Sequence, residues 1–538
     1  PQTPQKKTYY EYDTTRQGGG QYGNQTVAVE YRGTTPYRET LRHFRPNTTA
    51  WIVDRLAIET VRQLEGVAEP QNLRKTQHIY DDLSHTWDTP PDRGDRVRTA
   101  VTRIVDPRGS ADTWLTTQTV DYASGLYYLP VEVRDGESKA THTDYDATWK
   151  MYPVTVTDAY LTGLDLATSY TYDYVLGRPT SVTGPNAGST TSYTYDWWGR
   201  LQKVMRPGDT TDNPTVRYEY CDTCSPLRIS TWDIFQYSTG ALGSIPTHRF
   251  YNGLGQLIQE NQGTTDLSYM RVNHITYNAQ GLQADVYAPY QATYSTAYVA
   301  IDPQKPKTSY TYDALARQTQ VTHPDGKRVA TGYTGHKRIV LDENNHQKVY
   351  ENDVFGRLVT VKEYEGSYTS FNWDAQVYAE TTYRYDPLDQ LTSVEDYLDN
   401  QTTIVYDAAG RKIELRDPDM GTWRYGYDDA GKIITQTNAL NQTTCFYYDE
   451  LARLKGKNYC TTGICPPDGS WTVGYTYDST ANGNLGRGLR TGMNDPSGST
   501  VWKYDARGRV ISETKTISGP GGGAFTTQWT YNPRDEVI

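Results

Sequence analysis

The sequence has few of the residues that usually build a protein core. Hydrophobic residues make up 36% of its 538 residues, and it holds only 7 Phe and 5 Met. A typical globular domain has roughly 45–50% apolar residues. No stretch approaches the roughly 18 consecutive apolar residues of a membrane-spanning helix. A large aliphatic core and a transmembrane helix are therefore both disfavoured.

Positive charge and catalytic motifs are also scarce. The net charge is −11, and Lys and Arg form no basic block of the kind that nucleic-acid binding requires. The sequence contains no H-E-x-x-H, no close His/Cys cluster and no G-x-S-x-G. We therefore predict no nucleic-acid partner, no metal site, no cofactor and no catalytic residue.

Tyrosine is abundant where aliphatic residues are missing. The chain has 48 Tyr, and aromatic residues make up 12% of it. Disordered segments are poor in aromatic residues, so the low hydrophobicity does not indicate disorder. A tyrosine buries a large ring while its hydroxyl needs a partner, which suits extended sheets with two half-wet faces.

The five cysteines suggest local bridges. Cys221 and Cys224 are separated by two residues, and Cys460 and Cys465 by four, whereas Cys445 stands alone. A zinc site would need both pairs, but the pairs are far apart in the sequence and the second spacing is loose. A disulfide within each pair is the favoured interpretation, with free thiols as the alternative, and oxidised pairs would fit an extracytoplasmic protein. Cys445 is predicted to be a small packed residue on a strand.

One phrase recurs along the chain: an aromatic residue, any residue, Tyr, Asp, two further residues, a small residue and a basic residue. Its most regular block has a Tyr-Asp every 21 residues, and elsewhere the spacing drifts, which indicates insertions in loops. The predicted structural positions of the repeat are Tyr172, Asp173, Tyr195, Asp196, Gly199, Arg200, Tyr312, Asp313, Arg317, Gly356, Arg357, Tyr385, Asp386, Tyr406, Asp407, Gly410, Arg411, Tyr427, Asp428, Gly431, Tyr448, Asp449, Arg453, Tyr504, Asp505, Gly508 and Arg509.

The phrase describes the end of a strand followed by a tight turn. The two aromatic residues alternate with a period of two, so both rings leave the same face of a strand. The aspartate can accept a hydrogen bond from the backbone N–H two residues on, and the small residue permits a positive φ. The basic residue opens the returning strand, and a second turn follows, as at 417–421. Each repeat therefore predicts two short strands and two turns, with the Asp and basic residues fixing the turns.

A helical interpretation fails on composition. The 21-residue period equals three heptads, but Gly, Pro, Asn and Thr interrupt every copy. Residues 47–66 are the best helix candidate, yet they are rich in Trp, Ile and Val and are predicted to form a strand. Because one hairpin cannot bury its apolar face alone, we expect the hairpins to stack into one continuous array.

The phrase Y-x-Y-D-x-x-G-R resembles the repeat of Rhs/YD-repeat proteins, a family that includes Rhs polymorphic toxins, the C component of Tc toxins, and teneurins. The resemblance implies an all-β fold in which a strip of antiparallel β-hairpins spirals into a hollow shell. We divide the chain into an amino-terminal β-rich region with divergent repeats at 1–165, degenerate repeats at 166–300, and regular repeats at 301–538. The array stops inside a further copy of the phrase, so the chain looks like part of a longer polypeptide.

The function that the resemblance implies is a non-enzymatic encapsulating scaffold. In the toxin members, the shell encloses a carboxy-terminal toxic domain, and a D-P-x-G motif marks self-cleavage. This chain has those letters at 495–498, but repeats continue after them, so we expect no cleavage there. The expected partners are the chain's own carboxy-terminal cargo or toxin segment, a companion shell component and other copies of the chain, at a secreted or cell-surface location.

Two other functions stay open. The chain could be an extracellular surface, adhesion or filament-forming protein, which end-to-end assembly would reveal. It could also be a carbohydrate-active enzyme, since rows of aromatic residues such as Trp197 and Trp198 can stack on sugar rings. An enzyme of that kind needs a pair of carboxylates that are not part of the repeat and that face a cleft.

Overall fold

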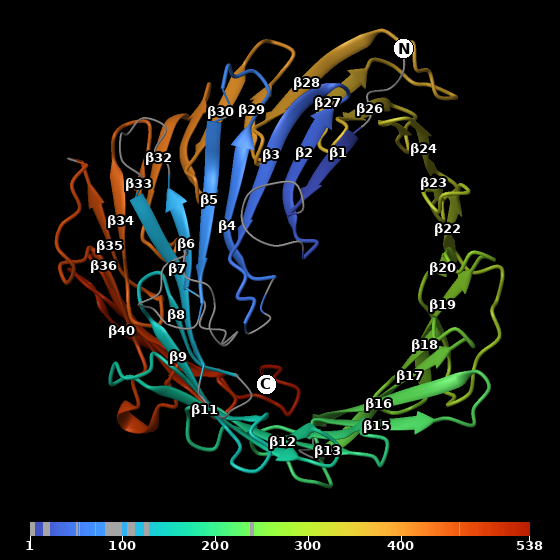
Figure 1. The fold of residues 1–538 in the computed structure, drawn as a ribbon. Helices are drawn as coiled ribbons and strands as arrows, with labels where there is room; N and C mark the ends of the chain where they lie inside the picture. Colours follow the sequence, from blue (N-terminus) through green and yellow to red (C-terminus); the bar gives the residue numbers. More distant parts are fainter. Residues whose placement is uncertain are drawn as a thin grey trace.

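A computed structural model shows that the chain consists almost entirely of β-strands (Figure 1). It describes residues 6–13, 22–49, 52, 54–69, 71–80, 99–104, 113–122, 129–236, 242–461 and 463–538. These residues form 40 strands and one three-residue 3-10 helix, η1 (Ala481–Gly483). The predicted all-β hairpin array is confirmed.

The strands up to residue 236 are β1 (Lys6–Tyr12), β2 (Gln25–Arg32), β3 (Thr35–Phe44), β4 (Leu56–Gln63), β5 (Gln71–Ile79), β6 (Thr99–Ile104), β7 (Thr113–Tyr122), β8 (Pro130–Asp135), β9 (Ala140–Tyr145), β10 (Pro153–Asp158), β11 (Leu166–Asp173), β12 (Arg178–Thr183), β13 (Thr190–Tyr195), β14 (Leu201–Met205), β15 (Val216–Cys221) and β16 (Leu227–Gln236). The next group comprises β17 (Leu242–Tyr251), β18 (Leu257–Gly263), β19 (Tyr269–Tyr277), β20 (Gln283–Tyr287), β21 (Tyr290–Thr293), β22 (Lys307–Tyr312), β23 (Gln318–Thr322), β24 (Arg328–Thr334), β25 (Lys337–Leu341), β26 (Gln347–Asn352), β27 (Leu358–Tyr364) and β28 (Val377–Tyr385). The remaining strands are β29 (Leu391–Glu395), β30 (Gln401–Tyr406), β31 (Lys412–Asp417), β32 (Gly421–Tyr427), β33 (Ile433–Thr437), β34 (Thr443–Tyr448), β35 (Leu454–Cys460), β36 (Val473–Tyr477), β37 (Arg490–Asp495), β38 (Gly498–Tyr504), β39 (Val510–Ile517) and β40 (Gly523–Gln528).

The strands form a single antiparallel meander. Each strand pairs with its neighbours in the chain, with one local exception at β21. There β19 pairs with β20 along one half of its length and with β21 along the other half, and β20 continues the sheet to β22. The segment 47–66, which we predicted to form a strand, does so at residues 56–63 as β4. The described residues before β4 form a turn at 48–49 and an isolated bridge between Asn47 and Ile52, and residues 50, 51 and 53 lie outside the described part. One sheet runs through the three regions that we defined in the sequence, so their boundaries stay a prediction.

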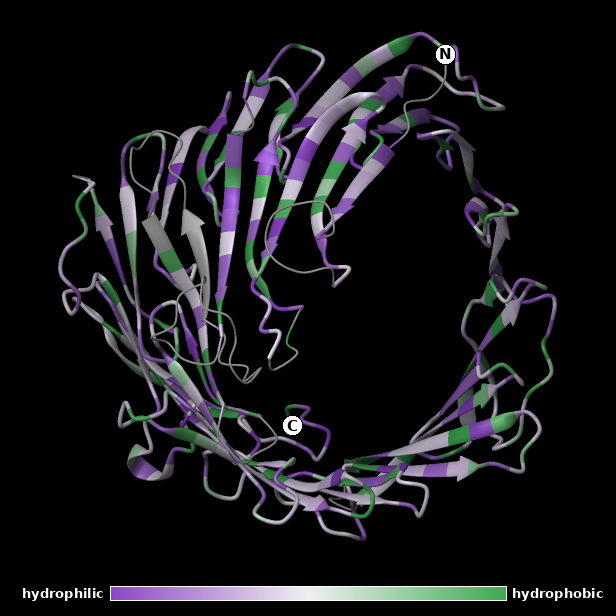
Figure 2. Cartoon of the chain, in the orientation of Figure 1, coloured by the Kyte–Doolittle hydropathy of each residue, from purple (hydrophilic) through white to green (hydrophobic). Residues whose placement is uncertain are grey.

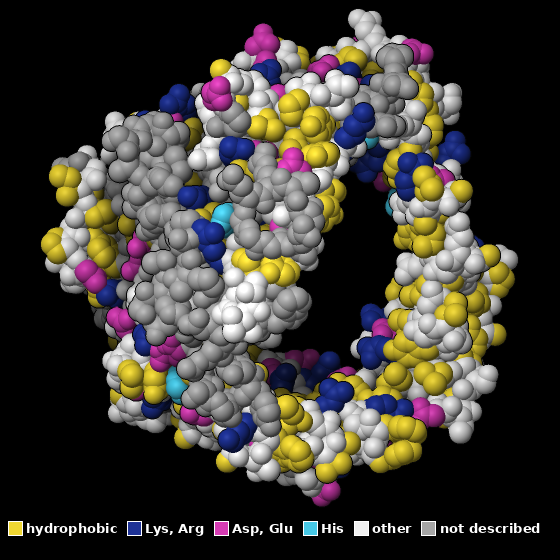
Figure 3. Space-filling view, viewed as in Figure 1, with side chains coloured by type: hydrophobic (Ala, Val, Ile, Leu, Met, Phe, Trp, Pro, Cys, Tyr) yellow, Lys and Arg dark blue, Asp and Glu magenta, His cyan; other side chains and the backbone are white. Residues whose placement is uncertain are grey.

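The strip winds through more than one turn around a central hollow, which is open in this view (Figures 1 and 3). In Figure 1, β2–β5 lie beside β27–β30, whereas β16–β24 form the opposite wall alone. Hydrogen bonds join residues that are 292 to 351 positions apart in the chain. One turn of the spiral therefore takes about that many residues, and its later strands pack edge to edge against its earlier ones.

The wall is one sheet thick and carries no thick apolar layer in the part that the structure describes. Most strand residues are half-buried, and Figure 2 shows hydrophilic and hydrophobic segments mixed along the strands. One small core joins Ile339, Val349 and Tyr364, against which Tyr368 and Ala375 pack. This burial pattern matches the tyrosine-rich, aliphatic-poor composition. No helix in the described part of the chain is long and apolar enough to cross a membrane.

Candidate functional site: the repeated turns and the seam between spiral turns

The repeated turn is a short hairpin loop closed by its aspartate. In the turn after β22, Asp313 Oδ1 accepts hydrogen bonds from the backbone N–H of Leu315 at 2.9 Å and of Arg317 at 3.0 Å. The pairing register shifts just before Tyr312, as in a hairpin with a bulge. A backbone N–H two residues on is also the donor at Asp173, Asp196, Asp353, Asp386, Asp449 and Asp505.

The small residue of the phrase occupies the left-handed region of backbone space. Its φ is +84° at Gly410 and +83° at Gly431, and it is +56° even at Ala452. Glycine adopts this conformation without the steric cost that a Cβ brings. The same conformation recurs at Gly199, Gly356 and Gly508.

The tyrosine hydroxyls tie each hairpin to the one before it. Tyr406 donates to the carbonyl oxygen of Leu391 at 3.0 Å, and Tyr427 donates to that of Lys412 at 2.7 Å. In both cases the acceptor is the first residue of the preceding returning strand, directly after the basic position. The equivalent tyrosines with the same kind of bond are Tyr195, Tyr448 and Tyr504. The tyrosines therefore form a ladder across the sheet.

The arginine of the phrase bridges neighbouring turns. Arg411 Nε donates to Asp407 Oδ2 at 2.7 Å, and its Nη1 donates to the carbonyl oxygen of Asp428 in the next turn at 2.8 Å. The guanidinium also lies 4.9 Å from the centroid of the Tyr427 ring, within the range of a cation–π contact. Arg200, Arg357, Arg453 and Arg509 likewise reach their own aspartate and a group in the following turn.

The pKa values of two turn aspartates are shifted in opposite directions. The Arg317 guanidinium holds the pKa of Asp313 below its usual value. The turn of Asp386 has Gln390 at the basic position, so no arginine of its own turn pairs with this carboxyl group. Burial raises the pKa of Asp386. The repeated aspartates thus serve as acceptors that close the turns. Among the described residues, no set of three or more His, Cys, Asp or Glu side chains could hold a metal ion.

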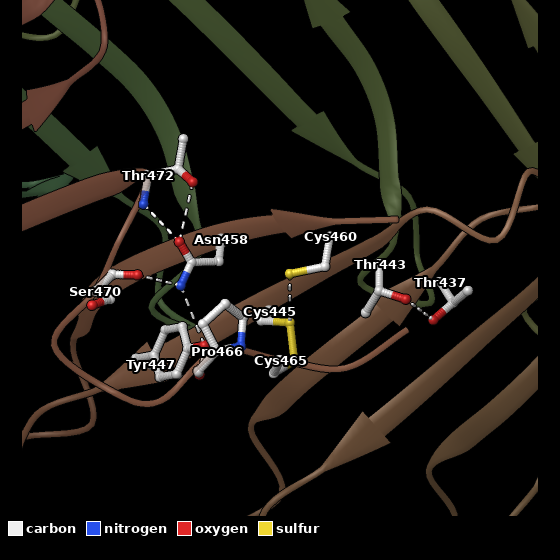
Figure 4. The surroundings of a disulfide bond; sticks show 10 residues. All are labelled: Thr437, Thr443, Cys445, Tyr447, Asn458, Cys460, Cys465, Pro466, Ser470 and Thr472. Carbon is white, nitrogen blue, oxygen red and sulfur yellow. Dashed lines mark hydrogen bonds between the residues drawn. A yellow bond between two sulfur atoms is a disulfide. The ribbon is translucent and has the colours of Figure 1, made fainter. Parts of the chain in front are cut away.

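The structure agrees with one predicted disulfide and replaces the other. Cys221 and Cys224 are bonded, with their Cα atoms 5.3 Å apart. The predicted bond between Cys460 and Cys465 is wrong: Cys465 pairs with Cys445, and Cys460 is free (Figure 4). The reason is that the loop after β35 folds back and carries Cys465 to Cys445 on β34, where the Cα separation of 5.7 Å suits a bridge.

Three inserted loops cross the sheet, and we call them straps 294–306, 365–376 and 463–472. A buried amide side chain clamps each strap through backbone groups. Gln259 donates to the carbonyl oxygen of Val299 at 2.7 Å and accepts from its N–H at 2.9 Å. Gln347 holds the second strap at Asn372, and Asn458 holds the third at Ser470 and Thr472. The sequence analysis missed these anchors, because an amide on a strand has no pattern that distinguishes it from a surface residue.

Each strap also lays an aromatic ring on a glycine of the sheet. A Cβ at Gly456 would lie 2.3 Å from the Trp471 ring, and a Cβ at Gly332 would lie 2.9 Å from Phe371. The straps therefore pack on parts of the sheet where a glycine, which has no side chain, leaves room for the aromatic ring. They also account for part of the irregular spacing of the repeat, since each strap lengthens one connection between strands.

A buried polar cluster lies beneath strap 294–306. His248 is 1% exposed, and its Nδ1 is 2.8 Å from Ser230 Oγ while its Nε2 is 3.1 Å from the Tyr294 hydroxyl. His274 is fully buried, with its Nε2 3.0 Å from the Tyr290 hydroxyl. Burial lowers the pKa of His248 to about 4 and also lowers that of His274.

The two spiral turns meet along a seam, where the repeated turns of the later strands contact the opposite edge of the earlier ones. Tyr37 is 2% exposed, its hydroxyl donates to the carbonyl oxygen of Asp386 at 2.7 Å, and its ring centroid lies 4.7 Å from that of Phe355. Further along, Lys139 Nζ donates to the carbonyl oxygen of Asp449 at 2.7 Å. The turn contacts thus continue from one end of the seam towards the other.

The far end of the seam holds a buried ion pair. Arg507 Nη2 lies 2.5 Å from Asp209 Oδ1, and these side chains are only 9% and 4% exposed. Arg507 Nε also donates to the carbonyl oxygen of Pro207 at 2.8 Å. Between the two ends, Asn186 and Arg487 exchange two hydrogen bonds, of 2.8 and 2.9 Å. Polar contacts therefore contribute much of the described seam.

Many of the seam contacts are made by the residue that lies two positions after the turn aspartate. The repeat phrase allows any residue at this position. This position supplies Phe355, Leu388, Leu451 and Arg507 on the later strands. Leu451, for example, lines a cavity of about 440 Å³ together with residues of β7 to β9. At the same position on the earlier strands, Trp198 and Leu315 are 63% and 73% exposed. Early and late copies of the repeat carry large side chains at this position. The sequence alone therefore does not show which of these side chains are buried in the seam.

These features define a repeat protein with a spiral, hairpin-built wall. The family model described as RHS Repeat matches residues 385–422 and 406–444, within the most regular block of the array. The chain therefore contains RHS repeats, and the resemblance to Rhs/YD-repeat proteins is confirmed. The comparison with curated proteins finds no match.

Solved structures of Tc toxin components share the fold. The crystal structure of TcdB2-TccC3-Cdc42 and that of TcdB2-TccC3 without its hypervariable C-terminal region both match with a TM-score of 0.77 at 14% identity. A Tc holotoxin pore from Photorhabdus luminescens matches with a TM-score of 0.74 at 13% identity. Each match covers 99% of this chain but only 36% of the other chain. The predicted fold class, a hairpin strip wound into a shell, is confirmed.

Proposed function

We propose that this chain is the wall of a non-enzymatic encapsulating scaffold, which encloses a carboxy-terminal cargo or toxin segment and shields it until delivery. The observation that carries the proposal is the continuous strip that closes on itself through seam contacts between residues 292 to 351 positions apart. A wall of paired strands has few free edges and would separate its contents from proteases. The matched structures join TcdB2 to TccC3, which supports a companion shell component as a partner and a secreted location.

Protease protection tests this function directly. The full-length polypeptide, with a tag at its carboxy terminus, is treated with a non-specific protease under native conditions. We expect the segment beyond the wall to survive intact, and to be cut in a variant that opens the seam, such as Arg507→Ala. Immediate digestion of the segment in the unaltered protein would rule out encapsulation.

A surface or filament-forming role is the second candidate. It is favoured by the exposed pair Trp197 and Trp198, whose side chains are 76% and 63% exposed at the tip of one turn. Within the described residues, β1 and β40 each pair on one side only, so further strands could add to either. Sedimentation over a range of concentrations decides between the roles. End-to-end polymers that Trp197→Ser and Trp198→Ser abolish would support the second role, whereas a monomer enclosing its cargo supports the first.

A further inference from the structure

We propose that Cys460 is a reactive thiol that exchanges with the Cys445–Cys465 disulfide and thereby releases strap 463–472 from the wall. Cys460 is the free cysteine of the chain, and its sulfur lies 4.0 Å from Cys445 Sγ. Cys445 and Cys460 belong to the adjacent strands β34 and β35, where Cys445 pairs with Asn458 in the register. The three sulfurs therefore form one compact group at the base of the strap (Figure 4).

The arrangement suits displacement at Cys445. Thiol–disulfide exchange proceeds by attack of a thiolate on one sulfur and departure of the other. The sulfur of Cys460 lies beside that of Cys445, which is bonded to Cys465 (Figure 4). Attack at Cys445 therefore makes Cys465 the leaving group. The Cys460 and Cys445 sulfurs must approach by about 2 Å to reach bonding distance. Side-chain rotation and a local shift of the two strands would supply this movement.

The exchange balances within the chain. The thiol of Cys460 loses its proton, and the resulting thiolate forms a bond to Cys445 Sγ. The Cys445–Cys465 bond breaks, and Cys465 leaves as a thiolate that takes up a proton. One disulfide forms for each one that breaks, so the step needs no outside oxidant or reductant.

The bond that would break is the covalent anchor of the strap. Near Cys465, the Tyr447 hydroxyl donates to the carbonyl oxygen of Pro466, and Ile464 is 76% exposed. The other end of the strap is held by the amide clamp of Asn458 and by the ring of Trp471 on the sheet. Exchange would therefore free the end that carries Cys465 while the clamp keeps the far end in place. Straps 294–306 and 365–376 contain no cysteine, so this lock is specific to the third strap.

Thiol labelling of the whole chain tests the exchange. The protein is held at about pH 5 or at about pH 8.5, because the attacking species is the thiolate, and its free thiols are then trapped with N-ethylmaleimide. Fragment-ion mass spectrometry locates the labelled cysteine. We expect the label on Cys460 alone after the acidic incubation and on both Cys460 and Cys465 after the alkaline one. The bonded pair Cys221 and Cys224 is the internal control and stays unlabelled. Label confined to Cys460 after the alkaline incubation would overturn the proposal.

Two matched variants test the release of the strap. Cys460→Ser removes the attacking thiol and keeps the Cys445–Cys465 bond, whereas Cys465→Ser removes the leaving group and lets Cys445 bond to Cys460 in an oxidising glutathione buffer. We expect cleavage by a non-specific protease at residues 463–468 to be about tenfold faster in Cys465→Ser than in Cys460→Ser. Two titratable thiols in oxidised Cys465→Ser, or equal cleavage rates in the two variants, would contradict the mechanism.

Discussion

At the residue scale, the turn aspartate acts first as a hydrogen-bond acceptor and second as a charge. Asp449 Oδ1 accepts the backbone N–H of Leu451 at 3.0 Å and of Arg453 at 2.9 Å, while Oδ2 accepts from Arg453 Nε at 2.8 Å. Asn252 and Asn278 stand at the same position in other copies and accept both backbone N–H groups without a charge. Asparagine can therefore replace the acceptor but not the ion pair.

This separation predicts different costs for two substitutions at Asp449. Asp449→Ala should destabilise the β34–β35 hairpin by about 2 kcal/mol, because two backbone N–H groups lose their acceptor. Asp449→Asn should cost about 0.5 kcal/mol, the usual size of a partly exposed ion pair. Native-state hydrogen exchange of the amides in β34 and β35 gives the free energy of local opening. Equal costs would mean that the charge, rather than the acceptor, holds the turn.

The small residue of the phrase yields a second prediction about the backbone. A Cβ at Gly431 would meet only Arg411 Cδ, at 4.0 Å, so Gly431→Ala tests backbone strain without a clash. We expect this change to cost about 1 kcal/mol in the β32–β33 hairpin, because alanine is strained at φ +83°. The reverse change, Ala452→Gly, should cause no loss in β34–β35. Hydrogen exchange measures both, and a similar loss in each would contradict the assignment to strain.

At the element scale, the hairpins could be predicted from the sequence and the straps could not. The phrase around Tyr427 and Gly431 encodes a strand end and a turn through local chemistry, which a single copy already contains. The clamps Gln259, Gln347 and Asn458 are polar residues on strands, and only the return of a distant loop makes them buried anchors. The wrong partner assigned to Cys465 has the same cause, since closeness in sequence says nothing about where a strap folds.

The histidine cluster beneath strap 294–306 predicts a pH-dependent element. Burial lowers the pKa of His248 to about 4, helped by the charge of Arg228 and opposed by that of Glu219. An exposed histidine titrates near 6.5, so between these values the open strap binds a proton that the closed strap does not. The closed strap should therefore lose stability as the pH falls from about 6.5 towards 4, by up to about 3 kcal/mol.

Hydrogen exchange of the strap amides around Tyr294, corrected for intrinsic rates, measures this dependence. In His248→Gln, the amide side chain can still bond to its neighbours but does not titrate, so the slope with pH should decrease. The slope that remains should come from His274, whose pKa burial also lowers. A strap whose opening does not change between pH values of about 4 and 7 would show that the cluster is not coupled to it.

At the scale of the whole molecule, the seam decides whether the strip is a closed wall or an open ribbon. Each hairpin contacts mainly its neighbours, so the array can fold by local contacts alone. Closure needs a second set of contacts between residues far apart in the chain, such as Arg507 with Asp209 and Tyr37 with Asp386. The sequence could not reveal these pairs, because the local phrase fixes neither the curvature of the strip nor the edges that meet.

The ion pair at the end of the seam tests whether closure of the wall is separate from the folding of its hairpins. Arg507→Ala leaves the carboxylate of Asp209 buried without its partner, which typically costs about 3–5 kcal/mol. We expect faster hydrogen exchange at residues 206–209 and a larger radius of gyration in small-angle X-ray scattering, with little change inside the β38–β39 hairpin.

Asp209→Asn in the same chain should restore part of the loss, because it removes the unpaired charge. Arg416→Ala is the matched control, since Arg416 is 65% exposed in its pair with Glu414. If Arg507→Ala loosened the hairpin as much as the seam, closure of the wall and folding of its repeats would be a single event rather than two.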